Sequence, residues 1–268
     1  LSSWQRILYD NISKKGALDF DPTNIKLGNR AINNIVMQLR KCCNHPFMFL
    51  NSYEDLIAND YIFRSSGKFE LLDRILPKLI AFRHRVLIFF QMTTSMDIMQ
   101  NYLNYKGIKH LRLDGTTKAE YRGDITNMFN APNSPYDVSL LSTRAGGLGL
   151  NPQSADTVII YDPDWNPQMD KQAEDRAHRI GQKKEVLVLR LITNTFIEEE
   201  IVQRAQEKMN LDQIFIQGGL FNLKSSEAER RQKLEDLFKK KRLDDETGGE
   251  EDIPDDEMIN KYISRDES

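Results

Sequence analysis

The side chains best suited to phosphate chemistry follow Asn166, in a polar segment with helical spacing. Asn166 is a good helix N-cap and Pro167 suits the first helical position, so a helix is predicted from here. In that helix Gln172, Arg176 and Arg179 are spaced i, i+4 and i+7 and share one face. Two guanidinium groups on one face can stabilise the charge that develops in phosphoryl transfer. The alternative is an exposed helix whose arginines pair with glutamates, and spacing alone leaves both open.

A second candidate segment, residues 142–151, directly follows a predicted strand, where open α/β sheets bind ligands. Thr143 and Arg144 offer hydroxyl and guanidinium donors, and glycines such as Gly147 allow a backbone to approach a phosphate closely. The spacing is neither the dinucleotide fingerprint, whose third glycine is missing, nor a Walker A loop, because no Gly-Lys-Ser/Thr follows. A tight connection between two elements is the alternative.

Trp165 stands in a polar turn, between Asp164 and Asn166. We therefore expect its indole to be at least partly exposed. It either folds back over the edge of the sheet or forms a wedge or stacking surface for a nucleic-acid strand.

Strand-length apolar runs alternate with helix-like segments and must position these groups. The predicted strands are residues 86–90, 109–113, 138–141, 157–161 and 186–191, and the predicted helices lie near 95–105, 118–129, 167–180 and 196–209. Continuous apolar runs are typical of strands buried on both faces, and β-α-β alternation implies a parallel sheet covered by helices. The sequence therefore predicts a doubly wound α/β domain.

The flanking regions differ in composition from this domain. Residues 30–39 and 67–82 have helical spacing, and residues 15–29 are polar, so we predict two helices and a loop. Residues 227–238 can form a helix, and the basic and acidic runs after it indicate a solvated or partner-ordered tail. The predicted division of the chain is 1–66, 67–195, 196–222 and 223–268.

Charge is unevenly distributed along the 268 residues, whose net charge is −3. Residues 227–268 hold 15 acids and 9 bases, which leaves 28 bases and 25 acids in the rest. Because the tail makes the chain acidic, the overall charge argues neither for nor against nucleic-acid binding. No apolar run approaches the ~20 residues of a membrane helix, and no apolar leader is visible, so we expect neither a membrane span nor an export signal.

The two cysteines, Cys42 and Cys43, are adjacent and cannot cross-link distant segments. This usage indicates a reducing compartment, the cytosol or the nucleus. Together with His45 they lack the Cys-x-x-Cys spacing of a zinc site. We predict that they pack in the interior and that the chain holds no metal.

Several segments, taken together, resemble the second-lobe motifs of superfamily-two helicase-like ATPases. They occur in the family's order at residues 89–93, 113–115, 142–151, 164–167 and 172–182. The ending Arg-Ala-His-Arg-Ile-Gly-Gln, at 176–182, is specific to the chromatin-remodelling branch, and residues 39–46 and 66–73 narrow the resemblance further. The whole chain looks like part of the catalytic subunit of a SWI/SNF-type remodeller. The family's usual residues are replaced by Pro152, Pro163, Met169 and Lys171.

The resemblance implies a RecA-like second lobe with helical flanks and an acidic tail that is partly helical and partly irregular. ATP and Mg²⁺ would be bound mainly by a first lobe, because the phosphate-loop lysine and the magnesium-holding acids have no counterpart here. The implied site residues are Arg176 and Arg179 as arginine fingers, Gln172 and Gly147 beside the nucleotide, and Thr143, Arg144, Trp165 and Lys68 on DNA. By itself the chain is expected not to hydrolyse ATP.

The resemblance also implies partners: nucleosomal DNA, histones, other subunits of a remodelling complex and the first lobe of the same protein. It implies that the protein acts in the nucleus. The 196–209 helix is expected to brace one lobe against the other. Arg230, Arg231 and Lys233 either form a solvated face or anchor an acidic histone surface. Two other classes remain: a strand-separating helicase and a non-catalytic nucleic-acid-binding module.

Overall fold

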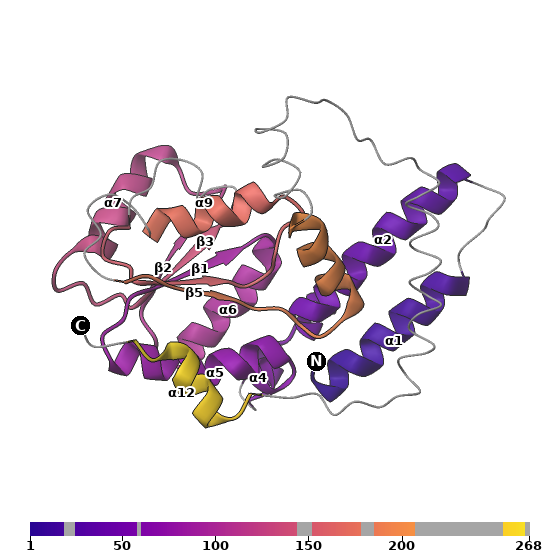
Figure 1. Cartoon of the computed structure of the whole chain (residues 1–268), viewed down its shortest axis with the longest axis horizontal. Coiled ribbons are helices and arrows are strands. Elements are labelled where there is room, and N and C mark those ends of the chain that lie inside the picture. The colour runs from indigo at the N-terminus through magenta and orange to yellow at the C-terminus, as the bar shows by residue number, and fades with distance from the viewer. Residues whose placement is uncertain (19–24, 58–59, 144–151, 178–184, 207–253, 266–268) are drawn as a thin grey trace.

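A parallel five-stranded sheet forms the centre of the molecule, with strand order β2-β3-β1-β4-β5 (Figure 1). The computed structural model describes residues 1–18, 25–57, 60–143, 152–177, 185–206 and 254–265. The strands are β1 (Val86–Phe90), β2 (His110–Leu113), β3 (Val138–Ser142), β4 (Thr157–Ile160) and β5 (Leu187–Arg190). Each of the five predicted strands is confirmed to within a residue or two at its ends.

Helices cover both faces of this sheet. The central strand β1 is therefore buried at every position, and all of its residues are apolar. Val86, Ile88 and Phe90 pack on one side with the helices α5 (Gly67–Ala81) and α6 (Thr93–Tyr105). Leu87 and Phe89 pack on the other side with α7 (Ala119–Asn130) and α9 (Pro167–Ala177). The predicted doubly wound, RecA-like α/β fold is confirmed.

Two long helices precede this domain and lie side by side (Figure 1): α1 (Ser3–Leu18) and α2 (Ile25–Asn44). Three short helices follow them, η1 (Pro46–Phe49), α3 (Glu54–Ile57) and α4 (Tyr61–Arg64). The predicted loop over residues 15–29 is wrong at both ends, because α1 continues to Leu18 and α2 begins at Ile25. Once nucleated, a helix extends through polar residues at little cost, and the apolar period marks only the part that packs.

The helix α12 (Asp256–Ile263) shows that the end of the tail packs against the lobe. Asp255 caps it by accepting a hydrogen bond from the Met258 N–H at 2.7 Å, and Ile259, 1% exposed, enters the same apolar cluster as α5. The expectation of a solvated or partner-ordered tail is therefore wrong for residues 254–265. The acidic run concealed a short amphipathic helix, and the predicted helix at 227–238 lies outside the described residues.

Residues 196–206 are helical, in agreement with the start of the helix predicted after the last strand. Ile197 and Ile201 of this helix pack with Tyr9 and Leu39 from α1 and α2. The helix therefore ties the N-terminal pair to the lobe. Within the described ranges, no helix is both long enough and apolar enough to span a membrane.

Candidate functional site

The carboxyl ends of β1, β3 and β4 lie side by side at one edge of the sheet, because all three strands are parallel and β1 lies between the other two. From β1 the chain passes to the outermost strand β2, returns to β3 beside β1, and then crosses to β4 on the other side of β1, so its winding reverses at β1. Open α/β sheets bind ligands at such a reversal. Most of the predicted site residues follow these strand ends.

Thr143 directly follows β3 and is only 5% exposed. Its hydroxyl donates a hydrogen bond to the carbonyl oxygen of Phe90, at the end of β1, over 3.0 Å. The side chain therefore joins two strand ends at the edge where the DNA contact is expected. Arg144 and Gly147 lie outside the described residues.

The helix α9 begins where the sequence predicts. The Asn166 side chain accepts a hydrogen bond from the Gln168 N–H at 3.2 Å, and Pro167 is the first helical residue. Ala173 packs against the sheet, whereas Gln172 is exposed. The backbone of Arg176 lies in α9 one turn after Gln172, which agrees with the predicted helix, and Arg179 lies outside the described residues.

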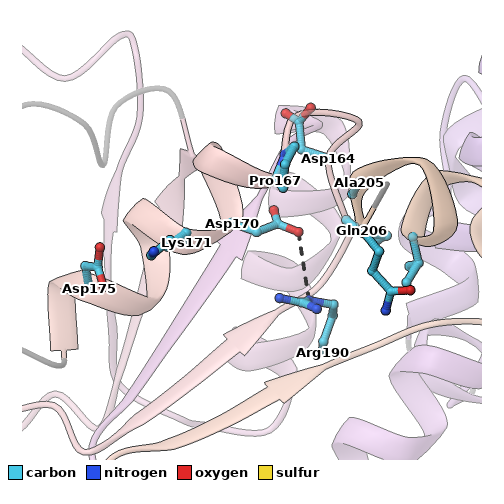
Figure 2. A pocket seen from close by; sticks show the side chains of 10 residues that line it. Asp164, Pro167, Asp170, Lys171, Asp175, Arg190, Ala205 and Gln206 are labelled. Carbon is cyan, nitrogen blue, oxygen red and sulfur yellow. Dashed lines mark ion pairs between the residues drawn. The ribbon is translucent and has the colours of Figure 1, made fainter. Parts of the chain in front are cut away.

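A charged pocket of about 330 Å³ lies between α9, β5 and the end of the 196–206 helix (Figure 2). Asp170 of α9 faces Arg190 of β5, with 3.8 Å between carboxylate and guanidinium. Asp164, Lys171 and Asp175 add further charges to the lining. Sequence reasoning missed this pocket because its walls come from three separate segments.

Trp165 is half-buried beside the pocket, so the predicted partial exposure is confirmed. Its indole packs against the cluster that contains Tyr9, Cys42 and Ile201. The guanidinium of Arg204, on the 196–206 helix, lies 5.4 Å from the centroid of the indole ring. The loop thus rests on the helical flank, and the DNA contact of Trp165 stays a prediction.

Lys68 lies inside the lobe, with 3% of its surface exposed. Its ammonium group contacts three acceptors: a Glu198 carboxylate oxygen at 2.6 Å, the Tyr161 carbonyl at 2.9 Å and the Asn44 side-chain oxygen at 3.4 Å. This burial argues against the expected phosphate contact. Local sequence gave no sign of the arrangement, because Glu198 is 130 residues away along the chain.

Asp162 completes this buried polar network. Its carboxylate accepts hydrogen bonds from the N–H groups of Gln91 and Met92, at 2.7 and 3.2 Å, and from the Asn44 amide at 3.2 Å. Burial raises the pKa of Asp162 to about 6, while the Gln91 N–H and the Lys68 charge oppose the rise. Sequence reasoning missed this residue, although an acid directly after a buried strand was a signal for it.

Cys42, Cys43 and His45 are buried and turn to different partners. The Cys43 sulfur lies 3.4 Å from the Thr195 hydroxyl, and Nε2 of His45 lies 2.7 Å from the Ile62 carbonyl. Burial raises the pKa of both thiols to about 12 and lowers that of His45 to about 3. Among the described residues no group of three or more His, Cys, Asp or Glu side chains is arranged to hold a metal ion.

Comparisons with known proteins place this geometry in a family. The model of the helicase conserved C-terminal domain matches residues 67–181. The chain is 54% identical, over 89% of its length, to the Saccharomyces cerevisiae transcription regulatory protein SNF2. It is 50% identical, over 100%, to the Drosophila melanogaster ATP-dependent helicase brm. It spans only 14% and 17% of these two relatives.

A solved structure supports the same assignment. The crystal structure of the C-terminal part of the Fun30 ATPase domain superposes with a TM-score of 0.64 at 30% sequence identity. The match covers 76% of this chain and 85% of that one. The parallel sheet and the helix after the Trp165 loop are consistent with the family of these relatives. The chain belongs to the SWI/SNF-type remodelling ATPases, as the second, RecA-like lobe.

Proposed function

We propose that this chain is the second ATPase lobe of an ATP-driven motor that moves along duplex DNA and repositions nucleosomes. The observation that carries the proposal is the 54% identity to SNF2, which extends beyond the family-matched lobe into both flanks. The carboxyl edge of the sheet supports it, because it gathers Thr143, the Trp165 loop and the start of α9. Action in the nucleus follows from the same relatives, among them the nuclear protein STH1/NPS1 of yeast.

ATP would react between this lobe and a first lobe in the same protein. Arg176 and Arg179 act as the arginine fingers, and Gln172 and Gly147 line the nucleotide site. The exposed position of Gln172 on α9 supports this arrangement. Mg²⁺ would neutralise the phosphates. We assign it to the first lobe, as the family resemblance implies.

DNA and histones are the proposed partners. Thr143, Arg144 and Trp165 contact one strand of nucleosomal DNA from the carboxyl edge. Opening and closing of the two lobes then move the duplex without separating its strands, and the 196–206 helix braces the lobes. Arg230, Arg231 and Lys233, outside the described residues, anchor a histone surface, and other subunits of a remodelling complex assemble on the complete protein.

The arginine fingers provide the direct test in the complete protein. Arg176→Ala or Arg179→Ala should lower the rate of ATP hydrolysis by ~10³-fold, because a finger stabilises transition-state charge. Arg83→Ala is the matched control, since Arg83 is exposed in the turn before β1, at the opposite edge of the sheet. Near-normal turnover in both finger variants would show that these arginines are structural.

Strand separation is the competing activity, because one similar protein of Arabidopsis thaliana carries the name probable ATP-dependent DNA helicase CHR12. The complete protein should slide nucleosomes and release no single strand from a labelled duplex under the same conditions. Release of a strand at the rate of ATP hydrolysis would favour the helicase function instead.

A further inference from the structure

The ammonium group of Lys68 is where four distant segments of the chain meet. Lys68 itself is on α5, Asn44 ends α2, Tyr161 follows β4, and Glu198 belongs to the 196–206 helix. Glu198 is held in turn, because its second carboxylate oxygen accepts the N–H and the hydroxyl of Thr193 at 2.6 and 2.8 Å. The two charged side chains are almost fully buried, with 3% of Lys68 and 2% of Glu198 exposed.

Both sides of this network lead to Trp165. On one side, the Tyr161 carbonyl that Lys68 holds lies at the start of the loop that carries the indole. On the other side, Glu198 is on the same helix as Arg204, whose guanidinium lies against the indole ring. Lys68 therefore links the loop to the surface on which Trp165 rests.

We propose that Lys68 is a positioning residue for Trp165: its buried ammonium fixes the 196–206 helix against the carboxyl end of β4 and so sets the place of the indole. This rests on the proposed function, in which Trp165 grips DNA. The role replaces the phosphate contact expected from the sequence.

The nature of the contact favours positioning over simple stabilisation. Burying two charges costs desolvation energy that their attraction only partly returns, and apolar residues of similar size often stabilise such a site equally well or better. What an apolar pair cannot supply is direction, because the hydrophobic effect does not depend on angle. Exchanging Lys68 and Glu198 together for apolar residues leaves no unpaired charge in the interior, although the Tyr161 carbonyl and the Thr193 N–H and hydroxyl lose these partners. We expect the fold to survive this exchange with its local geometry changed.

The first experiment measures the surroundings of Trp165 in the 268-residue chain. Trp4→Phe leaves Trp165 as the single tryptophan, since the sequence has two. Lys68→Met/Glu198→Met in this background should recover most of the melting temperature that Lys68→Met alone loses, because it leaves no unpaired charge in the interior. Acrylamide quenching of Trp165 should rise about twofold, because the indole is no longer held. Lys68→Arg with Glu198 unchanged keeps the positive charge, so it should retain part of the protection of Trp165 against acrylamide.

Lys78→Met is the control variant, because Lys78 lies on the same helix and its ammonium makes exposed contacts, with Asn260 at 2.7 Å and Asp256 at 3.7 Å. It should leave quenching unchanged. A purely structural role predicts that the double variant recovers both melting temperature and quenching, and this result would overturn the proposal. If Lys68→Met alone unfolds the chain, the double variant still distinguishes a positioning role from a purely structural one.

The second experiment uses the complete protein and compares nucleosome sliding per ATP hydrolysed. The double variant should fall to the ratio of Trp165→Ala, and Lys78→Met should keep the parent ratio. If Trp165→Ala slides normally, the DNA grip fails, whereas the quenching result still tests whether Lys68 positions the indole. Normal quenching in the double variant refutes the positioning role by itself.

Discussion

At the scale of single residues, the carboxyl edge of the sheet contains side chains of two kinds. Thr143 and Lys68 are buried, and their polar groups are taken up by backbone and side-chain partners of the lobe. Gln172 is exposed on α9, and Trp165 is half-buried. A ligand reaches the second kind most directly, so those residues carry the sharper tests.

Trp165→Ala in the complete protein should lower the distance slid per ATP hydrolysed. Stacking of an aromatic side chain on a base contributes about 1–3 kcal/mol, enough to hold a strand between ATP cycles. The measurement compares hydrolysis and sliding in one preparation.

Trp165→Phe is the control for this test, because it keeps an aromatic ring and should retain most of the coupling. An alanine variant that slides normally would exclude the DNA grip. A melting temperature several degrees lower would show that the indole serves mainly to pack the cluster around Tyr9 and Ile201.

At the scale of elements, α12 is the part whose place was least expected. Arg74 contacts Asp256 at 2.9 Å, and Lys78 donates to Asn260 at 2.7 Å, so the helix follows α5 over one turn. Beyond it, Arg265 donates to the Asp156 carbonyl and the Thr157 hydroxyl at 2.9 and 2.6 Å. The end of the tail is thus attached to the amino edge of the sheet, opposite the candidate site.

Ile259→Ala should detach this helix, because removing a buried isoleucine costs about 2–5 kcal/mol, and Ile263, the other residue of α12 that packs against the apolar cluster, is only partly buried. Hydrogen exchange of residues 254–265 should then accelerate while the strands keep their protection. Met258→Ala is the control, since Met258 is 41% exposed on the same helix. Equal protection of α12 in both variants would mean that the ionic contacts alone hold it.

At the scale of the whole molecule, the fold is a RecA-like lobe, to which the proposed function assigns half of an ATPase site. The sheet has both faces covered, and the N-terminal helices and the 196–206 helix pack together on its flank. No residue in the sequence matches a phosphate loop. We therefore expect this chain to fold by itself and to be unable to hydrolyse ATP by itself.

The 268-residue chain by itself should show no DNA-stimulated ATP hydrolysis, because the proposed function assigns the groups that bind the phosphates and Mg²⁺ to the first lobe. Phosphate release is measured with and without duplex DNA, beside the complete protein. Turnover that persists through purification and disappears in Arg176→Ala would show that the chain carries a whole site.

The sequence by itself determined the sheet, its helices and the family. Five apolar runs identified the strands because a strand buried on both faces must be apolar along its length. Asn166 and Pro167 located the start of α9 because capping is a local steric and hydrogen-bonding property. The motif order indicated the SWI/SNF-type ATPases, which the comparisons confirm.

Only the tertiary structure decided what Lys68 and the end of the tail do. Lys68 meets Glu198 across 130 residues, and Lys78 meets Asn260 across 182. Periodicity and caps report the environment of neighbouring residues, whereas these partners are brought together only by the tertiary fold. The sequence alone therefore does not distinguish a lysine that binds phosphate from one that is buried in an ion pair. The burial of Lys68 beside the Glu198 carboxylate shows which of the two it is.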